Sequence, residues 1–303
     1  MADRPGRRIQ PPLKTAGTAC AIHVAQRSPA SNRVAMNAIA ITDNEFNRFQ
    51  RFIYQAAGIT LSSSKKALVS GRLAKRLGEH NLGTYAEYLA LLSRLDAADE
   101  VQTAIDLLTT NETYFFREGK HFELLRDLAL QRKALAEPLR VWSAACSSGE
   151  EPYSIAMVLA DVLEQAAWKV LGTDISSRVL RQAATGHYAL QRTRLIPEAY
   201  LKRFCLRGEG SQSGTLLVER TLRSRVQFMP ANLNSQLPRI GSFDVIFLRN
   251  VMIYFNGDTK RQVVMRALAQ LKRGGLLFIG HSESLHDITD EVVQFAPAVY
   301  RKP

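Results

Sequence analysis

Three acidic side chains stand where a nucleoside could bind. Glu150 and Glu151 follow a loop of small residues, 144–149, and Asp174 comes 23 residues after Glu151. Carboxylates accept hydrogen bonds from an amine or a ribose, and small residues let a ligand approach the backbone closely. The loop lacks the lysine and serine or threonine arrangement that cradles phosphates, which disfavours a nucleoside triphosphate. A positively charged nucleoside fits better, and S-adenosylmethionine is the common ligand of this kind.

The chain around these carboxylates has the layout of a doubly wound α/β sheet. Val141 and Trp142 indicate a short strand before the loop, and apolar residues recur at helical spacing over 152–162 after it. The segment 169–174 then reads as a second strand that ends in Asp174. Such sheets bind ligands at the carboxyl ends of their strands. An ordinary turn with an accidental acidic helix start is the alternative.

Polar side chains also follow later predicted strands. The segment 226–233 carries Asn232 near its end, and residues 245–248 form the continuous apolar run expected of a strand buried on both faces. The polar residues after that run are Arg249, Asn250 and Tyr254. Two strand ends thus offer amides beside the first loop. His281 follows one more strand, and a lone histidine there is more often structural than catalytic.

Composition limits the class of protein. With 303 residues, 46% of them hydrophobic, the chain can bury a full core and form two domains. The net charge of +12 predicts an acidic partner: nucleic acid, an anionic membrane surface or an acidic protein. The three cysteines form neither a paired framework nor a metal-ligand cluster with the six histidines, which indicates a reducing cytoplasm. No apolar run approaches the roughly 18 residues of a membrane span, and the start lacks the apolar block of a secretion signal.

The first part of the chain divides into a basic tail and a helical domain. Residues 1–38 are rich in proline, alanine, serine, threonine and arginine without a sustained period, which predicts a disordered tail. Translation could also start at Met36. From Thr42 the pattern becomes helical, and Gly58 ends the first helix. We expect a small all-helical domain over 39–108.

The second predicted helix, 64–77, carries a cluster of cations. Leu73 and Leu77 face inward at helical spacing. The cations expected to face outward are Lys65, Lys66, Arg72, Lys75 and Arg76. A solvated face is the usual explanation, but such a surface would also suit docking onto an acidic helical partner. The residues that would contact such a partner, as a substrate of the protein, are Arg72, Lys75 and Arg76.

The stretch 109–120 joins the helical domain to the rest of the chain and does not read as a simple linker. Threonines and Asn111 interrupt the helix by local hydrogen bonding, and the aromatic residues 114–116 precede Arg117. A domain junction of this kind is a favoured place for a ligand pocket. An interdomain hinge with buried aromatic residues is the alternative.

The remainder, 121–303, is expected to form the doubly wound domain with a small antiparallel β insertion at about 200–224. Short strand-like pieces in the insertion are separated by Gly208, Gly210 and Gly214. An insertion at the edge of a sheet adds surface without disturbing the core. We therefore expect it to contact a partner.

Several motifs in order make the chain from about residue 41 resemble the chemotaxis receptor glutamate methyltransferases, the CheR family. They are TTNETYFFRE, VWSAACSSGEEPYSIA, GTDIS, ANL, FDVIFLRNVMIYF and GGLLFIGHSESL. The resemblance implies an S-adenosylmethionine-dependent methyltransferase domain behind an all-helical domain. Its substrates would be glutamates in the cytoplasmic helical region of membrane chemoreceptors. It further implies a cytoplasmic monomer that uses no metal, binds no nucleic acid and does not insert into the membrane.

The resemblance also implies a site, residue by residue. The cofactor contacts would be Asn111, Thr113, Arg117, Glu151, Asp174, Asn232, Leu233, Arg249 and Asn250. Of the acidic pair, the family pattern favours Glu151 over Glu150. The family places Arg117 and Tyr254 near the transferred methyl group, where Arg117 could align the acceptor carboxylate and Tyr254 could donate a hydrogen bond. Whether the β insertion binds a receptor C-terminal peptide stays open.

Two other classes of protein compete with this interpretation. A nucleic-acid methyltransferase would explain the net charge, but RNVMIY stands where such enzymes carry an Asn or Asp-Pro-Pro-aromatic loop. A binding module that keeps the fold without catalysis is disfavoured by the intact set of polar residues. Transfer to a glutamate needs no general base, because that side chain is already ionised near neutral pH. The absence of a nucleophile–histidine pair from the motifs agrees with such a reaction.

Overall fold

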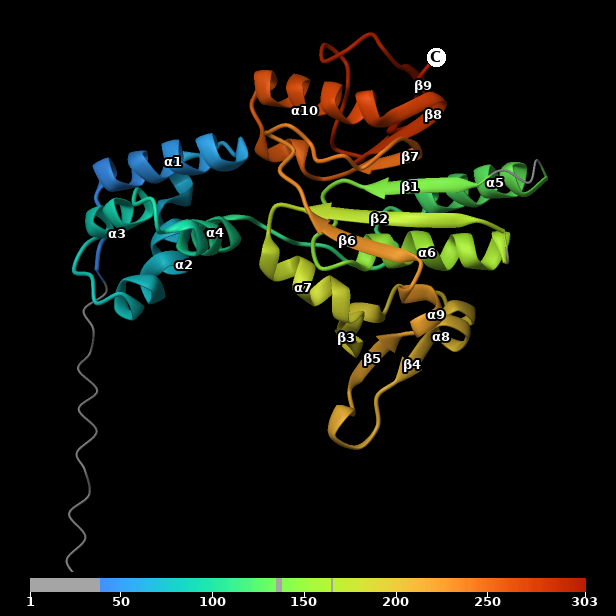
Figure 1. Ribbon diagram of the computed structural model, residues 1–303, viewed down its shortest axis with the longest axis horizontal. Helices are drawn as coiled ribbons and strands as arrows, with labels where there is room; N and C mark the ends of the chain where they lie inside the picture. The colour runs from blue at the N-terminus through green and yellow to red at the C-terminus, as the bar shows by residue number, and fades with distance from the viewer. Residues whose placement is uncertain (1–38, 135–137, 165) are drawn as a thin grey trace, which may run out of the picture. The chain divides into compact units, whose positions relative to one another are not determined.

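The computed structural model describes residues 39–134, 138–164 and 166–303, all of which belong to one unit, Ala38–Pro303. The predictions for residues 1–38, a basic tail and a translation start at Met36, lie outside the described residues. A helical part comes first, and a large mixed sheet with flanking helices follows (Figure 1).

The helical part has its own hydrophobic core. Its elements are α1 (Asp43–Ala57), η1 (Ser63–Lys65), α2 (Lys66–Glu79), α3 (Tyr85–Leu92) and α4 (Ala98–Leu108). Thr42 begins α1 with a capping box, because its hydroxyl accepts from the Glu45 amide and the Glu45 carboxylate accepts from the Thr42 amide. Gly58 ends α1 in the left-handed conformation, as predicted. Leu73 and Leu77 are fully buried, also as predicted.

A seven-stranded mixed sheet forms the centre of the rest of the described chain, in the order β6-β2-β1-β7-β8-β10-β9. The strands are β1 (Leu139–Ser143), β2 (Trp168–Asp174), β6 (Val226–Pro230), β7 (Phe243–Leu248), β8 (Leu271–Ile279), β9 (Val293–Ala296) and β10 (Val299–Arg301). The strands from β6 to β8 in this order are parallel, and β10 runs antiparallel to both of its neighbours, β8 and β9. The strand order reverses between β1 and β7. Their carboxyl ends form the switch point at which such sheets bind ligands.

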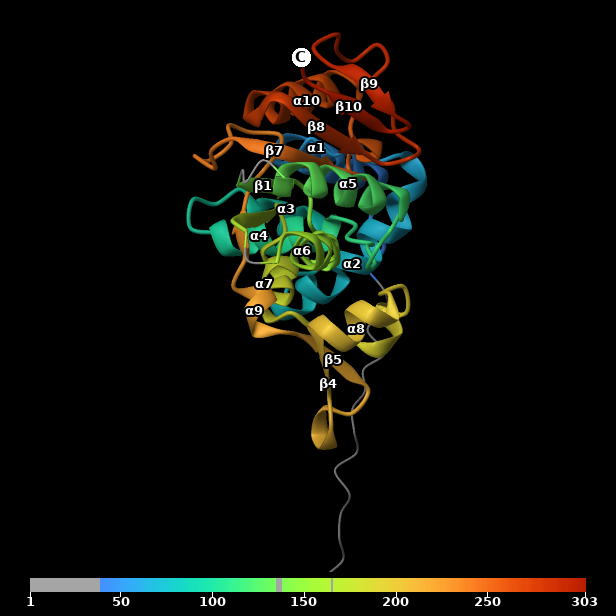
Figure 2. The ribbon, with the colours of Figure 1, turned by 90° about the vertical axis from the view of Figure 1, so that its right-hand side faces the viewer.

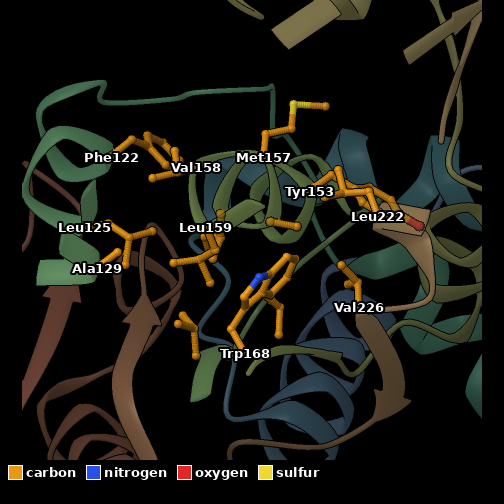
Figure 3. Close-up of a cluster of buried hydrophobic side chains, with 14 of the residues drawn as sticks. Phe122, Leu125, Ala129, Tyr153, Met157, Val158, Leu159, Trp168, Leu222 and Val226 are labelled. Atoms are coloured by element: carbon orange, nitrogen blue, oxygen red, sulfur yellow. The ribbon is translucent and has the colours of Figure 1, made fainter. Parts of the chain in front are cut away.

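Helices cover both faces of this sheet. On one face α5 (Lys120–Ala134) and α6 (Glu150–Leu163) share a core with Val141 (Figure 3). On the other, α10 (Gly257–Gln270) packs with Trp142, because successive strand residues point to opposite faces. Shorter elements of this part are α7 (Ser177–Thr185), α9 (Arg220–Arg223) and η4 (Met252–Tyr254). The predicted doubly wound architecture is confirmed. Among the described helices, none is long and apolar enough to cross a membrane.

The predicted antiparallel insertion is present as a separate sheet of order β3-β5-β4. Its elements are β3 (His187–Ala189), η2 (Leu190–Thr193), α8 (Glu198–Phe204), β4 (Cys205–Arg207), η3 (Gly210–Gln212) and β5 (Thr215–Val218). Figure 2 shows it at the opposite end of the unit from α10. The insertion begins earlier than predicted, at β3. The strand β3 belongs to it because it pairs with β5, which lies far along the chain. Such a distant pairing leaves no signal in the local sequence, so the prediction missed it.

The glycine pair Gly274 and Gly275 predicts a turn of the chain from sequence alone, and this prediction is wrong. Gly274 and Gly275 lie inside β8 and do not turn the chain, although Gly274 has a φ of 73°. The pairing of β7 with β8 shifts register between Phe243 and Val245, which is the bulge that two flexible residues allow. A Cβ on Gly275 would lie 2.9 Å from the Asp244 carbonyl oxygen, so this close approach requires glycine. The pair β9–β10 is a further element that the sequence pattern did not predict.

Candidate active site

A pocket opens at the switch point, where strand ends meet the junction after α4. It holds about 840 Å³ of empty space, including the part open to solvent. Its lining includes Asn111, Thr113, Arg117, Glu151, Asp174, Asn232, Leu233, Arg249, Asn250 and Tyr254. The tertiary structure therefore brings every residue with a predicted cofactor or catalytic role to one cavity.

Asp174 ends β2 at the wall of this pocket and is only 7% exposed. Its Oδ2 accepts a hydrogen bond from the Ser147 amide at 2.8 Å, and its Oδ1 accepts one from the Ser176 amide at 2.9 Å. Burial raises the pKa of Asp174, and these two backbone donors act against that rise. Each carboxylate oxygen can accept a second hydrogen bond. Asp174 thus fixes the loop after β1 and retains acceptor capacity for a ligand.

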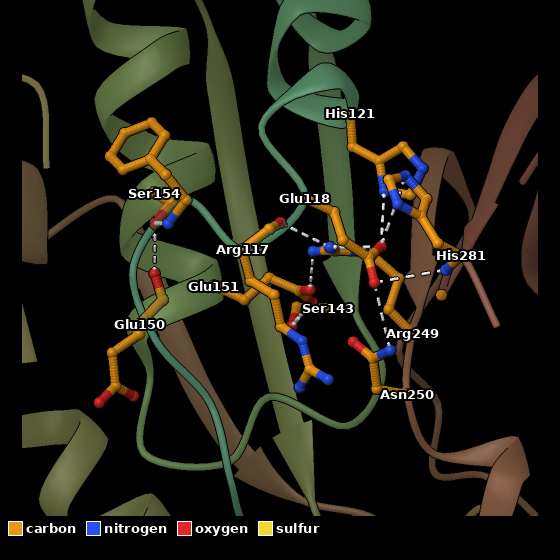
Figure 4. A network of polar contacts seen from close by, with 12 residues as sticks. Arg117, Glu118, His121, Ser143, Glu150, Glu151, Ser154, Arg249, Asn250 and His281 are labelled. Carbon is orange, nitrogen blue, oxygen red and sulfur yellow. Dashed lines mark hydrogen bonds and ion pairs between the residues drawn. The ribbon is translucent and has the colours of Figure 1, made fainter. Parts of the chain in front are cut away.

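Glu151 and Arg249 form a buried ion pair across the switch point (Figure 4). Nη1 of Arg249 donates to Oε2 of Glu151 at 2.7 Å, and the Ser143 hydroxyl donates to Oε1 at 2.7 Å. The Arg249 side chain is 1% exposed. The pair ties the helix start after β1 to the end of β7, so both side chains hold the shape of the pocket.

Glu118 joins the same network and is a residue that the sequence reasoning missed. Nη2 of Arg249 donates to Oε2 of Glu118 at 2.8 Å, and Nδ2 of Asn250 donates to Oε1 at 3.3 Å. Burial opposes ionisation of Glu118, but the hydrogen bond and charge of Arg249 outweigh it and lower the pKa. Glu118 and Asn250 both have positive φ, at 60° and 55°, a backbone strain that is common at functional sites. The available signal was an acid directly after Arg117.

The polar ends of the Arg117 and Tyr254 side chains, the predicted catalytic residues, have few partners among the described residues. Nη1 of Arg117 donates to the Glu112 carbonyl at 3.2 Å, and the guanidinium lies 5.6 Å from the centre of the Tyr114 ring. The Tyr254 hydroxyl has no hydrogen-bond partner within the described chain. Burial raises the pKa of Tyr254 and the charge of Arg117 opposes the rise, so the phenol is protonated near neutral pH. Both side chains can therefore meet a ligand in the pocket.

The helical part forms one side of the pocket. Nδ2 of Asn232 donates to the carbonyl of Ala56 near the end of α1 at 2.7 Å. The Thr60 amide donates to the Tyr254 carbonyl at 2.8 Å. Asn232 therefore fastens α1 to the end of β6 besides lining the pocket.

The junction between α4 and α5 has buried aromatic residues and also lines the ligand pocket, which are the two properties considered from the sequence. Phe115 is fully buried and meets the Tyr188 ring edge-on at 4.9 Å, so the aromatic residues anchor this segment. Asn111 and Thr113 line the pocket, and the Ser147 hydroxyl donates to the Asn111 carbonyl at 2.9 Å. The anchored rings thus hold the polar residues against the loop after β1.

The two neighbouring acids of α6 have different surroundings. Glu150 is fully buried outside the pocket lining, where it pairs with Arg192 and accepts from the Ser148 hydroxyl. Burial raises the pKa of Glu150, and the charge of Arg192 opposes this. Only Glu151 of the two reaches the pocket, in agreement with the preference for Glu151.

Sequence comparisons identify the family. The model of the CheR methyltransferase SAM-binding domain matches residues 111–300, and the model of the CheR all-alpha domain matches residues 44–109. This chain belongs to the CheR methyltransferase family. The chemotaxis protein methyltransferases of Escherichia coli K12 and Salmonella typhimurium LT2 are 42% and 41% identical to it over 265 residues. Each match covers 86% of this chain, and 92% and 91% of the respective relatives.

The pocket of this CheR-family methyltransferase fits S-adenosylmethionine. Ala144 and Ala145 line it beside Glu151, and their small side chains leave room for a nucleoside. Its acidic lining residues are Glu112, Glu151 and Asp174, which suit a ligand with a positive charge. The predicted class of enzyme, a methyltransferase dependent on S-adenosylmethionine, is confirmed by the family.

The exposure of the α2 cations in this CheR-family chain differs from the expected outward face. The side chain of Arg76 is 19% exposed and pairs with Glu79 and Glu100. Arg72 is half-buried and donates to two backbone carbonyls at the end of α4. Lys75 is 84% exposed. The expectation that these cations lie largely on an outward face does not hold for Arg72 and Arg76, because groups at α4 bind their guanidinium groups.

Proposed function

We propose that this protein transfers the methyl group of S-adenosylmethionine to glutamate side-chain carboxylates of chemotaxis receptors. The observation that carries the proposal is the pocket at the switch point, which gathers the expected cofactor contacts together with Arg117 and Tyr254. Relatives at about 40% identity over most of this chain are named chemotaxis protein methyltransferases. The product would be a glutamate methyl ester.

In the proposed cofactor site, some residues would bind the cofactor directly and others would hold the pocket walls. Asp174 would accept hydrogen bonds from ribose hydroxyls, since its carboxylate lines the pocket and retains acceptor capacity. Glu151 and Arg249 would act mainly by holding the walls, because their charged groups already pair with each other. The remaining contacts would come from Asn111, Thr113, Arg117, Asn232, Leu233 and Asn250.

S-adenosylmethionine supplies a methyl group on a positively charged sulfonium when it is bound. In this pocket Arg117 would align the acceptor carboxylate by a charged hydrogen bond. Tyr254, whose raised pKa keeps it protonated, would donate a hydrogen bond near the reacting centre. The walls would exclude water, which otherwise stabilises the separated charges that the transfer neutralises. The acceptor is already ionised near neutral pH, so the transfer needs no general base.

The proposed substrate is the cytoplasmic helical region of a membrane chemoreceptor, which places the enzyme in the cytoplasm. The net charge of +12 favours an acidic partner of this kind. Lys75 is the best exposed of the predicted docking residues, and its solvent-exposed pair with Glu79 at 3.3 Å would give way to receptor carboxylates. Arg72 and Arg76 would contribute through the field of α2, because their guanidinium groups are engaged.

The decisive experiment is incubation with labelled S-adenosylmethionine and receptor-containing membranes. Label that is released as methanol by mild base identifies methyl esters and supports the proposal. Membranes that lack receptors serve as the control. Label that resists base but is lost on nuclease treatment would instead identify a nucleic-acid methyltransferase. Calorimetry without detectable S-adenosylmethionine binding would favour a binding module.

A further inference from the structure

Glu118, His121 and His281 form a cluster behind the cofactor pocket, although the sequence predicts no metal site and a structural role for His281. One ligand atom from each of these residues lies within 4.8 Å of the others. Nδ1 of His121 is 3.5 Å from Oε2 of Glu118, and Nε2 of His281 is 3.9 Å from the same oxygen. Figure 4 shows the two imidazoles side by side next to the Glu118 carboxylate.

His121 is the unusual member of the cluster. It is 1% exposed, and within the described chain neither ring nitrogen has a hydrogen-bond partner of good geometry. A buried polar group without a partner needs an explanation, and an ion is one. Imidazole nitrogens are among the commonest metal ligands in proteins.

We propose that Glu118, His121 and His281 bind a divalent transition-metal cation such as Zn²⁺. Two imidazoles and one carboxylate, with a position left for water, form a common protein ligand set for zinc. Zinc–ligand distances of about 2.0–2.2 Å in a tetrahedron require ligand atoms roughly 3.3–3.5 Å apart. The pair of Glu118 and His121 already meets this spacing. The 48% exposed His281 side chain has room to close the remaining gap.

Charge at the cluster permits a cation despite the nearby arginine. Arg249 is paired with Glu118 on one side and with Glu151 on the other, so two carboxylates surround one guanidinium. Because Oε2 of Glu118 accepts from Arg249, which lines the cofactor pocket, the metal site would adjoin that pocket through this ion pair.

The test is calorimetric titration of the full chain, stripped of metal by a chelator, with Zn²⁺. We expect saturable binding, weakened more than about tenfold in His281→Ala, since even loss of an outer-shell partner costs 10–100-fold. His286→Ala is the matched control, because His286 lies in the same loop, is 87% exposed and should leave binding unchanged. His121→Gln, checked for folding by circular dichroism, should weaken binding as His281→Ala does.

Cobalt substitution distinguishes this site from cysteine binding. Co²⁺ held by imidazole and carboxylate should give visible d–d bands without a thiolate charge-transfer band, and His281→Ala should remove those bands. A wild-type protein without saturable Zn²⁺ binding would overturn the proposal, as would equal binding by the wild type, His281→Ala and His121→Gln. The titration needs no receptor and no S-adenosylmethionine. Its failure would therefore leave the proposed methyl transfer untouched.

Discussion

Arg249 and Glu151 are 98 residues apart in sequence, yet Nη1 of the arginine lies 2.7 Å from Oε2 of the glutamate. Arg249 follows β7, and Glu151 lies in the first turn of the helix after β1; these two parallel strands pair directly. The same guanidinium reaches Glu118 in the junction. One buried cation therefore joins three segments around the cofactor pocket.

Arg249→Ala should lower the free energy of unfolding by about 3–5 kcal/mol, because it leaves buried carboxylates without their partner. Urea unfolding of the wild type and of Arg249→Ala would measure the difference in the free energy of unfolding. The control is Lys202→Ala, which removes an exposed pair with Glu198 and should change stability by at most about 1 kcal/mol. Equal effects of the two substitutions would contradict the structural role of Arg249.

Asp174→Ala should weaken S-adenosylmethionine binding roughly ten- to a hundredfold, the equivalent of a hydrogen bond to a charged group of about 1.5–3 kcal/mol. Calorimetry would give the dissociation constant. Asp174→Asn, which keeps one acceptor oxygen for the loop amides, separates loss of charge from loss of loop structure. An unchanged dissociation constant in both variants would remove Asp174 from the site.

Tyr254→Phe should lower kcat more than cofactor affinity, because the proposed hydrogen bond lies at the reacting centre. Steady-state rates with receptor membranes would be compared with cofactor binding measured by calorimetry. Tyr54→Phe is a suitable control, since this tyrosine is 41% exposed and outside the pocket lining. Equal losses in turnover and affinity would reassign Tyr254 to cofactor binding.

Lys75→Glu should reduce receptor methylation about two- to fivefold, as expected from an exposed ion pair worth up to about 1 kcal/mol. Wild-type activity should also fall with added salt, since exposed charges are screened over about 8–10 Å. Cofactor affinity should stay constant, because Lys75 does not line the pocket. Reversal of Arg72 and Arg76 is a poorer test, since it would also break their contacts with α4. If neither the substitution nor added salt changed the methylation rate, the exposed cations of α2 would be a solvated face without a docking role.

Glu100→Gln should destabilise the helical domain by about 1.5–3 kcal/mol near neutral pH, since a charged acceptor is lost. Burial opposes ionisation of Glu100, but hydrogen bonds from Arg76, Tyr88 and His80 outweigh it and lower its pKa to about 2. A lowered pKa adds stability above the ordinary value of 4.5, and this stability disappears as the pH falls toward 2. Unfolding measured across that range should show the wild type and the variant converging. A pH-independent difference would exclude the charge as its cause.

Much of the site could be predicted from the sequence because its members occupy local positions with a local signature. Asp174 ends one apolar strand and Arg249 follows another, and the carboxyl ends of parallel strands meet at one edge of a sheet. The capping box of Thr42 and the left-handed conformation of Gly58 likewise depend on only a few neighbouring residues. Short-range backbone preferences decide such features before any tertiary contact forms.

Only the tertiary structure decided which charges are paired. Arg72 and Arg76 have the same helical spacing as an exposed cationic face, but α4 supplies carbonyls and Glu100 to them. Glu118 and His121 lie in a junction and a helix whose pattern says nothing of Arg249 or His281. The contacts of Glu118 with Arg249 and His281 depend on where the chain returns after more than a hundred residues. Ion pairing and burial follow from distances in space, which periodicity along the chain does not encode.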